Sequence, residues 1–171
     1  LKKEDQTIND YYQLVRRKVL THYSIDKPPV ETSGGLTLVN MVVDIERIGD
    51  YCKNISDLTL MRDGPMDFGE LSDDIKSIEQ EVESRFTKTI QAIENQDEAL
   101  AENLLNNYKK MVTKVSDRIV KDIASGRIQF PDSSQGASIA LYSRYLKRIG
   151  AHLKNITSTI VNPYDKIGYN Q

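Results

Sequence analysis

Apolar residues recur every three or four positions along most of the chain, which places them on one face of an α-helix. The clearest stripe is Met41, Ile45, Ile48, Cys52 and Ile55. Similar stripes, with Phe86 on the third, predict five long helices, over residues 3–23, 36–61, 72–95, 97–125 and 137–160. Most glycines and prolines lie between these segments, where they are expected to end helices. The pattern predicts an all-α fold of long antiparallel helices.

One nine-residue stretch occurs twice. RIGDYCKNI begins at Arg47 and RIGAHLKNI begins at Arg148, and the two copies share Arg, Ile, Gly, Lys, Asn and Ile. The helices that precede them also share an apolar pattern, so the first and second helices correspond to the fourth and fifth. The third helix has no counterpart, which indicates a three-helix unit whose first copy lacks its first helix. We therefore predict a partial two-helix repeat over residues 1–64 and a complete three-helix repeat over residues 65–171.

An incomplete repeat would leave an apolar face exposed, and such faces bind partners. We expect a homodimer, or another contact in place of the missing helix, to cover this face. The alternative is an intrinsic array of five helices. The chain starts with Leu1 rather than methionine, which we interpret as the start of a fragment.

Composition excludes several functions. The net charge is −2 with 28% charged residues, which does not favour nucleic acid or an anionic membrane surface as partner. One cysteine excludes an internal disulfide and a cysteine-based zinc site, and it suits a reducing compartment. No apolar run approaches the roughly 18 residues that span a bilayer. The sequence contains no phosphate-binding glycine-rich loop, nucleophile elbow or His-Glu-x-x-His motif.

An acidic pair on the second helix is the main candidate for chemistry. Glu46 and Asp50 are four residues apart, so they lie on one helix face, and Asn54 continues the same column. Like charges at this spacing repel, so a basic partner or a hard cation should offset them. Arg47 in the same motif is one such partner, which would make the pair an ordinary solvated face. Neither interpretation is excluded by the residues alone.

The second copy of the motif lacks the acids, because Lys147 and Ala151 stand in their places. His152 is a further candidate ligand, although a lone histidine on a bundle is more often a packed or surface residue. Cys52, on the apolar stripe, is expected in the core.

The two copies share structural positions as well. Gly49 and Gly150 lie inside long helices, where glycine costs about 1 kcal/mol relative to alanine, so they suggest close helix approach or room for a ligand. Asn54 and Asn155 are equivalent positions one turn further on, and they either bond across helices or face water.

The stretch DIERIGDYCKNI resembles the motif of PhoU-family proteins, and a three-helix unit written twice is the PhoU architecture. The C-terminal stretch RIGAHLKNITSTIVNPYDKIGY is similar to the cytosolic PhoU-like domain of bacterial and archaeal sodium/phosphate cotransporter-type membrane proteins. The resemblance is specific at the motif and diffuse elsewhere along the chain.

This resemblance implies a non-catalytic regulator of phosphate uptake. It implies a divalent or iron-type metal ion at Glu46 and Asp50, with Asn54 and His152 as further candidate ligands. The implied partner is a membrane transporter domain upstream or another phosphate-transport component, at the cytoplasmic face of a prokaryotic membrane. One alternative is a structural helical bundle without metal. Another is a carboxylate-bridged metalloenzyme, which is disfavoured because neither histidine follows a glutamate by three residues.

Overall fold

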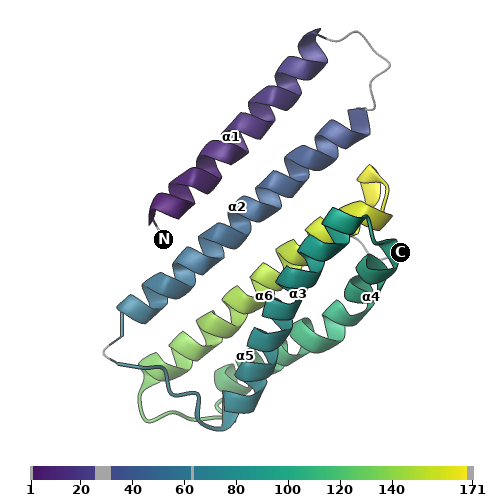
Figure 1. Ribbon diagram of the computed structural model, residues 1–171. Helices are drawn as coiled ribbons and strands as arrows, with labels where there is room; N and C mark the ends of the chain where they lie inside the picture. Colours follow the sequence, from purple (N-terminus) through teal and green to yellow (C-terminus); the bar gives the residue numbers. More distant parts are fainter. Residues whose placement is uncertain (1, 26–31, 63, 169–171) are drawn as a thin grey trace.

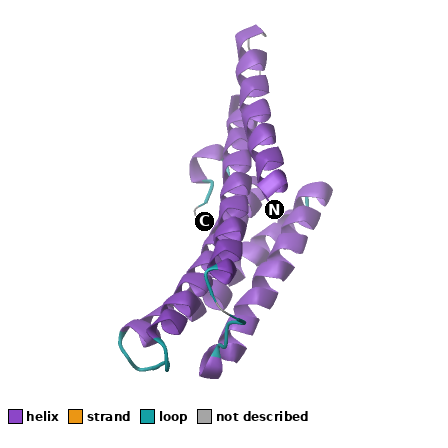
Figure 2. Ribbon diagram, turned by 90° about the vertical axis from the view of Figure 1, so that its left-hand side faces the viewer, coloured by secondary structure: helices purple, strands orange, loops and turns teal. Residues whose placement is uncertain are grey.

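The computed structural model describes residues 2–25, 32–62 and 64–168. These residues form helices joined by short connections, and none of them forms a strand (Figure 1, Figure 2). The helices are α1 (Lys2–Ile25), α2 (Thr32–Leu60), α3 (Ser72–Asn95), α4 (Glu98–Tyr108), α5 (Lys114–Ala124) and α6 (Ser133–Val161). A π-helical turn, η2 (Lys109–Thr113), joins α4 to α5 without a break, and two short 3-10 turns are η1 (Gly69–Leu71) and η3 (Tyr164–Lys166). The predicted all-α fold with five long helical segments is confirmed.

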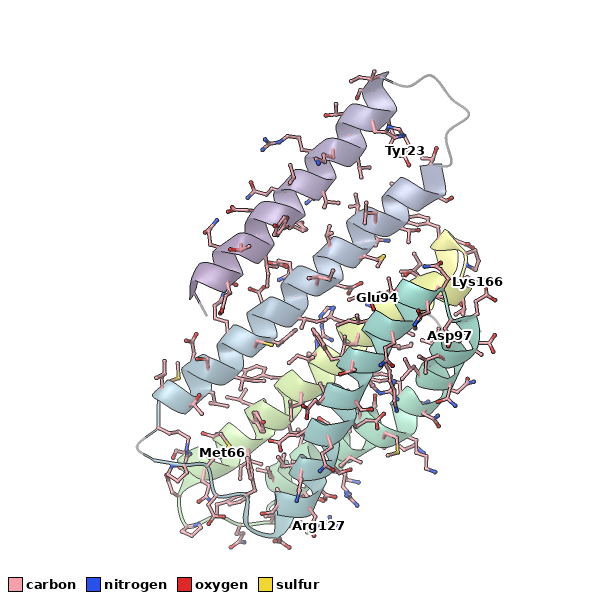
Figure 3. The ribbon with its side chains drawn as sticks, in the orientation of Figure 1. Tyr23, Met66, Glu94, Asp97, Arg127 and Lys166 are labelled. Atoms are coloured by element: carbon pink, nitrogen blue, oxygen red, sulfur yellow. The ribbon has the colours of Figure 1, made fainter. Side chains whose placement is uncertain are left out.

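Helix α6 is the centre of the assembly. It packs against α2, α3, α4 and α5, whereas α1 packs against α2 at the outer side (Figure 1). Helices α3, α4–η2–α5 and α6 therefore make a three-helix bundle, and α2 with α1 forms a helical pair beside it. The connections lie at the two ends: Figure 3 shows Met66 and Arg127 at one end and Asp97 and Lys166 at the other.

The apolar core lies mainly in the three-helix bundle. Its largest fully buried apolar side chains are Ile75, Ile78, Val112, Ile119 and Ile139. Helix α2 adds Ile48 and Leu58, but no described side chain of α1 is buried. The first helical pair is thus attached through α2, and α1 covers α2 only partly.

Two helices begin earlier than the glycine pattern predicts. Helix α2 starts at Thr32 rather than at residue 36, because Gly35 lies within its first turns and contacts Tyr23 of α1. The Gly35 amide donates a hydrogen bond of 3.0 Å to the Tyr23 hydroxyl, and a Cβ at this position would collide with the ring. Helix α6 starts at Ser133, because the Asp132 side chain accepts a hydrogen bond from the Ser134 amide and caps the helix. At the start of α2, Gly35 therefore permits the close approach of Tyr23 instead of ending a helix.

Gly150 lies where three helical segments meet. A Cβ at this position would lie 3.2 Å from Cε2 of Tyr108, 3.4 Å from Cγ1 of Val112 and 3.8 Å from Cγ2 of Val82. Tyr108 precedes the π-helical turn, and its hydroxyl donates to the Lys147 carbonyl at 3.2 Å. The glycine therefore allows α6 to contact both α3 and the wide turn between α4 and α5.

Candidate functional site

Helices α2 and α6 run antiparallel and meet through repeat-equivalent residues. His152 lies 2.7 Å (Nδ1 to Oδ1) from Asp44, and the rings of Tyr51 and Tyr145 are 6.0 Å apart between centroids. Positions 44 and 145 are equivalent in the repeat, as are positions 51 and 152, because the two nonamers lie 101 residues apart. Each contact is therefore the counterpart of the other. This places an approximate two-fold axis between the two helices.

Asp44 is the polar centre of this α2–α6 seam. It is 9% exposed and accepts hydrogen bonds from the ring of His152 and, at 3.1 Å, from the side-chain amide of Asn155. The Tyr51 ring stacks on the His152 ring at 5.8 Å, and Arg148 donates to the Tyr51 hydroxyl at 3.1 Å. The seam thus joins the two helices by partly buried and exposed polar contacts, and the Asp44 carboxylate accepts two of the hydrogen bonds.

The acidic pair on α2 lies away from this seam and has basic neighbours. Asp50 pairs with Arg47 and with Lys53, each at 3.3 Å, and Glu46 lies 3.7 Å from the Arg47 guanidinium. Lys53 also binds Asp5 of α1 at 3.1 Å, which links α1 to α2. The two contacts with carboxylates raise the pKa of the Lys53 ammonium group. The charge of the pair is therefore largely offset by the protein itself.

The predicted metal ligands Glu46 and Asp50 of α2 are not brought together with His152 of α6, because His152 contacts another face of α2. Asp44, which holds His152, precedes Glu46 by two residues and therefore lies about 200° around the helix from it. Among the described residues, no three His, Cys, Asp or Glu side chains are placed to hold a metal ion together. Glu46 and Asp50 alone supply too few oxygen ligands for a hard cation, which takes six or more. The described residues therefore do not form a complete metal site by themselves.

The second copy of the motif uses its altered residues for packing between helices. Lys147 donates to Asp117 of α5 at 2.6 Å, and Arg144 donates to the same carboxylate at 3.0 Å. Lys147, which stands at the position equivalent to Glu46, is thus paired with Asp117 of the same three-helix bundle. Asn155 belongs to the seam, whereas its equivalent Asn54 is half-buried on α2.

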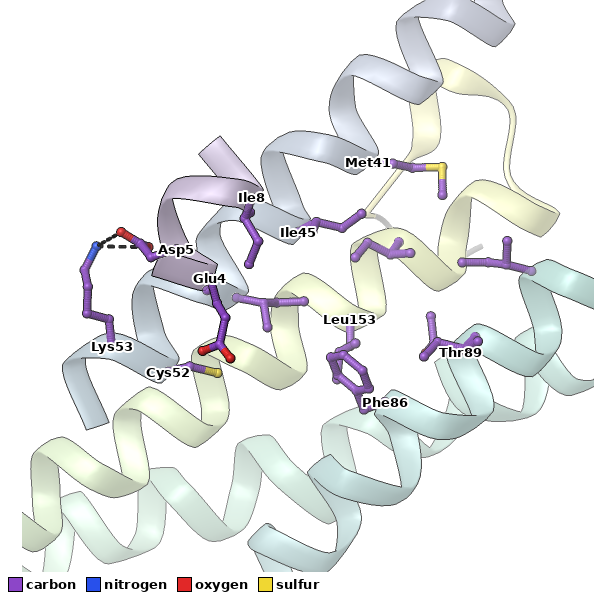
Figure 4. A pocket seen from close by; sticks show the side chains of 15 residues that line it. Glu4, Asp5, Ile8, Met41, Ile45, Cys52, Lys53, Phe86, Thr89 and Leu153 are labelled. Atoms are coloured by element: carbon purple, nitrogen blue, oxygen red, sulfur yellow. Dashed lines mark hydrogen bonds and ion pairs between the residues drawn. The ribbon is translucent and has the colours of Figure 1, made fainter. Parts of the chain in front are cut away.

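An apolar groove of about 420 Å³ lies between the two parts of the molecule. It is lined by Ile8 of α1, by Ile45, Gly49 and other α2 residues, by Phe86 and Ile90 of α3, and by Leu153 of α6. Figure 4 shows Ile8 and Ile45 on one side of this space and Phe86 on the other. Ile45, Phe86 and Ile90 are 43%, 46% and 44% exposed, respectively. The apolar stripe of α2 is predicted to pack in a core. In the structure, part of this stripe lines the groove instead.

Cys52 lies at the groove and not in the core, which corrects the expectation from its place on the apolar stripe. The reason is that its side of α2 faces the groove, while Tyr51 and Lys53 of the same turn contact α6 and α1. Partial burial by the groove walls nevertheless raises the pKa of the Cys52 thiol above its ordinary value.

This predicts a slow, pH-dependent reaction of Cys52 with iodoacetamide. Only the thiolate reacts, and a raised pKa lowers the thiolate fraction at any given pH. The rate near pH 7.5 should therefore be lower than that of a cysteine in an unstructured peptide, and it should continue to rise above pH 9. Mass spectrometry follows the reaction cleanly, because the chain has one cysteine. A rate at pH 7.5 equal to that of the peptide would contradict the prediction.

Sequence reasoning missed the role of Asp44 as the partner of His152. The signal was present in the repeat, since Asp44 and Tyr145 are equivalent, as are Tyr51 and His152. When the two motif helices pack antiparallel, Asp44 lies opposite His152 and Tyr51 lies opposite Tyr145. That pairing was not predicted, because the stripe of each helix gives its buried face but not the helix that covers it.

Within the described segments, no helix combines the length and apolar character needed to cross a membrane. Comparisons with curated proteins and with solved structures found no match. A comparison with protein families matched residues 1–59 and 75–160 to the family described as PhoU domain. The matched residues include both copies of the motif and make up most of the chain. The chain therefore belongs to the PhoU domain family.

Proposed function

We propose that this chain is a regulatory domain of phosphate uptake that performs no catalysis. The observation that carries the proposal is the PhoU-family match over both helical units. The proposal extends to a finer assignment, the cytosolic part of a sodium/phosphate cotransporter-type membrane protein, which rests on the resemblance of the C-terminal stretch. Its partner would then be the transporter domain or another component of phosphate transport, at the cytoplasmic face of the membrane.

Phosphate uptake by cells tests this function. The initial uptake rate of radioactive phosphate would be measured at low and high external phosphate, with the full gene and with the segment for residues 1–171 removed. A regulatory domain predicts that removal changes how the rate depends on external phosphate. An unchanged dependence would contradict the proposal. A rate that falls only in proportion to the amount of transporter in the membrane would favour a structural domain instead.

Metal binding at Glu46 and Asp50 is a second, separable part of the proposal. The two carboxylates lie on one face of α2, but each is close to a cation of the same helix. A divalent or iron-type ion at this place would need further ligands from outside the described residues. It would also compete with Arg47 and Lys53.

Metal content of the purified protein checks this part. The protein would be loaded in turn with iron, zinc, manganese, nickel and magnesium, dialysed and analysed for each element. Metal binding by the pair predicts about one equivalent of metal in the wild-type protein, and less than one equivalent would contradict this part of the proposal. The variant Glu46→Ala/Asp50→Ala is the control. One equivalent that is lost in this variant would show that the pair forms a metal site.

A further inference from the structure

We propose that the outer face of α5 and of the π-helical turn before it binds an anionic membrane surface. The net charge of −2 does not favour such a partner, but the charges are distributed unevenly along the chain. Residues 109–127 contain six lysines and arginines and only two aspartates. The inference concerns lipid binding and does not depend on the proposed function.

Four of these cations lie along one side of the helical segment. Lys110, Lys114, Arg118 and Lys121 follow one another at intervals of four, four and three residues, so they share one face over about 16 Å. We call these four residues the basic face. All four are exposed, whereas Ile119 on the opposite side of α5 is fully buried. The basic face therefore points away from α3 and α6, which pack on α5, and it lies far from α1 (Figure 1).

The two aspartates of this segment do not neutralise the basic face. Asp117 already accepts hydrogen bonds from Arg144 and Lys147 of α6, so cations outnumber the carboxylate at this place. Asp122 is only 5% exposed and therefore lies away from the solvent-facing side of α5.

Three lysines of the basic face have no acidic partner in the described part of the chain. Arg118 pairs with Asp74 of α3, but no described carboxylate lies within ion-pair distance of Lys110, Lys114 or Lys121. Their charge is balanced only by ions in solution, which an anionic surface would replace. A helix face with four basic residues in a row has the composition that binds anionic lipid headgroups.

An exposed methionine beside the lysines favours a lipid surface. Met111 is 38% exposed, whereas the next residue, Val112, is fully buried. In a regular α-helix both positions would point within about 60° of the direction of Tyr108. The π-helical turn takes more residues per turn, so Val112 points inward and Met111 outward. An apolar side chain among lysines is typical of helices that lie in a membrane interface.

Nucleic acid is a poorer partner for the basic face. Proteins that bind single strands combine basic residues with aromatic rings on which the bases stack. Residues 109–125 contain no aromatic residue. An acidic protein would satisfy the lysines, but it would not require the exposed methionine.

Sedimentation of the protein with lipid vesicles tests the proposal. Vesicles of equal parts phosphatidylcholine and phosphatidylglycerol should bind the protein at low salt, whereas vesicles of phosphatidylcholine alone should not. Binding should weaken as the salt concentration rises, because salt screens the attraction between exposed charges. Absence of binding to the anionic vesicles at low salt would overturn the proposal. Binding to polyglutamate but not to these vesicles would also overturn it, since an acidic protein would then be the partner.

Charge reversals locate the contact on the protein. Lys114→Glu/Lys121→Glu should weaken binding to the anionic vesicles by about thirtyfold or more, since each lysine near such a surface contributes about fivefold. Arg17→Glu/Lys18→Glu is the matched control, because it makes the same change in net charge at exposed positions of α1. This control should retain most of the binding. Equal losses in the two variants, with circular dichroism showing both folded, would overturn the assignment to the basic face.

Met111→Ser tests the apolar part of the contact. It should weaken binding to the anionic vesicles about threefold without changing the salt dependence, because an apolar side chain no longer enters the interface. An unchanged affinity would show that this residue stays outside the lipid, contrary to the proposed orientation of the basic face.

Discussion

Replacing Gly150 by leucine is expected to lower the free energy of unfolding by about 2 kcal/mol. Overpacking a well-packed site costs roughly 1–3 kcal/mol, and the gain in helix propensity returns less than about 1 kcal/mol of it. The site is tight on three sides, because a Cβ would already lie 3.2–3.8 Å from Tyr108, Val112 and Val82. The further carbons of leucine would have to separate α6 from α3 or from the π-helical turn. Urea denaturation followed by circular dichroism measures the loss.

Gly49→Leu is the matched control for this variant. It makes the same substitution at the equivalent position of the other unit, where the side chain would extend into the groove and contact Ile8. The expected change is less than about 1 kcal/mol in either direction, because the helix-propensity gain is similar and little overpacking opposes it. Equal losses for the two variants would show that the two glycines are packed alike, contrary to the structure.

Arg85→Ala is expected to be the most destabilising substitution at a charged residue, with a loss of about 3 kcal/mol. Arg85 is 3% exposed, its guanidinium pairs with Glu81 at 2.8 Å, and it donates to the Leu104 carbonyl at 2.6 Å. Burial lowers the pKa of the guanidinium, and Glu81 opposes this shift, so the group remains charged near neutral pH. Truncation leaves a buried carbonyl without this donor and removes a packed stem, and a hydrogen bond from a charged group contributes roughly 1.5–3 kcal/mol.

Arg118→Ala separates this effect from the general loss of a cation. Arg118 pairs with Asp74 at 2.5 Å, but its side chain is 53% exposed. Exposed pairs contribute about 0–1 kcal/mol, so the control should change the unfolding free energy by no more than that. Urea denaturation of both variants at one salt concentration gives the comparison. A loss at Arg85 no larger than the loss at Arg118 would mean that the buried contacts contribute no net stability.

The helical period predicted the fold because long stripes leave little choice of secondary structure. The repeat was inferred from the nonamer instead, of which six letters are the same in both copies, and the division into two repeat units stays a prediction. The boundaries at Gly35 and Gly136 were less predictable, because glycine ends a helix or admits a neighbouring ring depending on the tertiary contact. At Gly136 that neighbour is Phe130, whose Cδ2 would lie 3.0 Å from an added Cβ.

The stripe of α3 shows a second limit. Phe86 was assigned to the buried stripe, yet it is 46% exposed, and the adjacent Arg85 is buried instead. Both positions are compatible with the helical period, so apolar character alone favours the phenylalanine. The choice is made by the Leu104 carbonyl and the Tyr108 ring, which lie on another helix and give the guanidinium its partners. A single sequence does not indicate such contacts.

The acidic motif shows a third limit. The sequence correctly places Glu46 and Asp50 on one face, but it does not decide between a metal and a basic partner. In the structure, cations at positions 47 and 53 of the same helix lie within ion-pair distance. Metal binding at this face therefore stays a prediction, whose test is the metal content of the acidic-pair variant.

Phosphate uptake in cells tests the central claim, that this chain regulates phosphate uptake, most directly. The claim rests on the PhoU-family match over both helical units. If the claim holds, removal of residues 1–171 should change the dependence of the uptake rate on external phosphate, at an equal amount of transporter in the membrane. An unchanged dependence after removal would contradict the account.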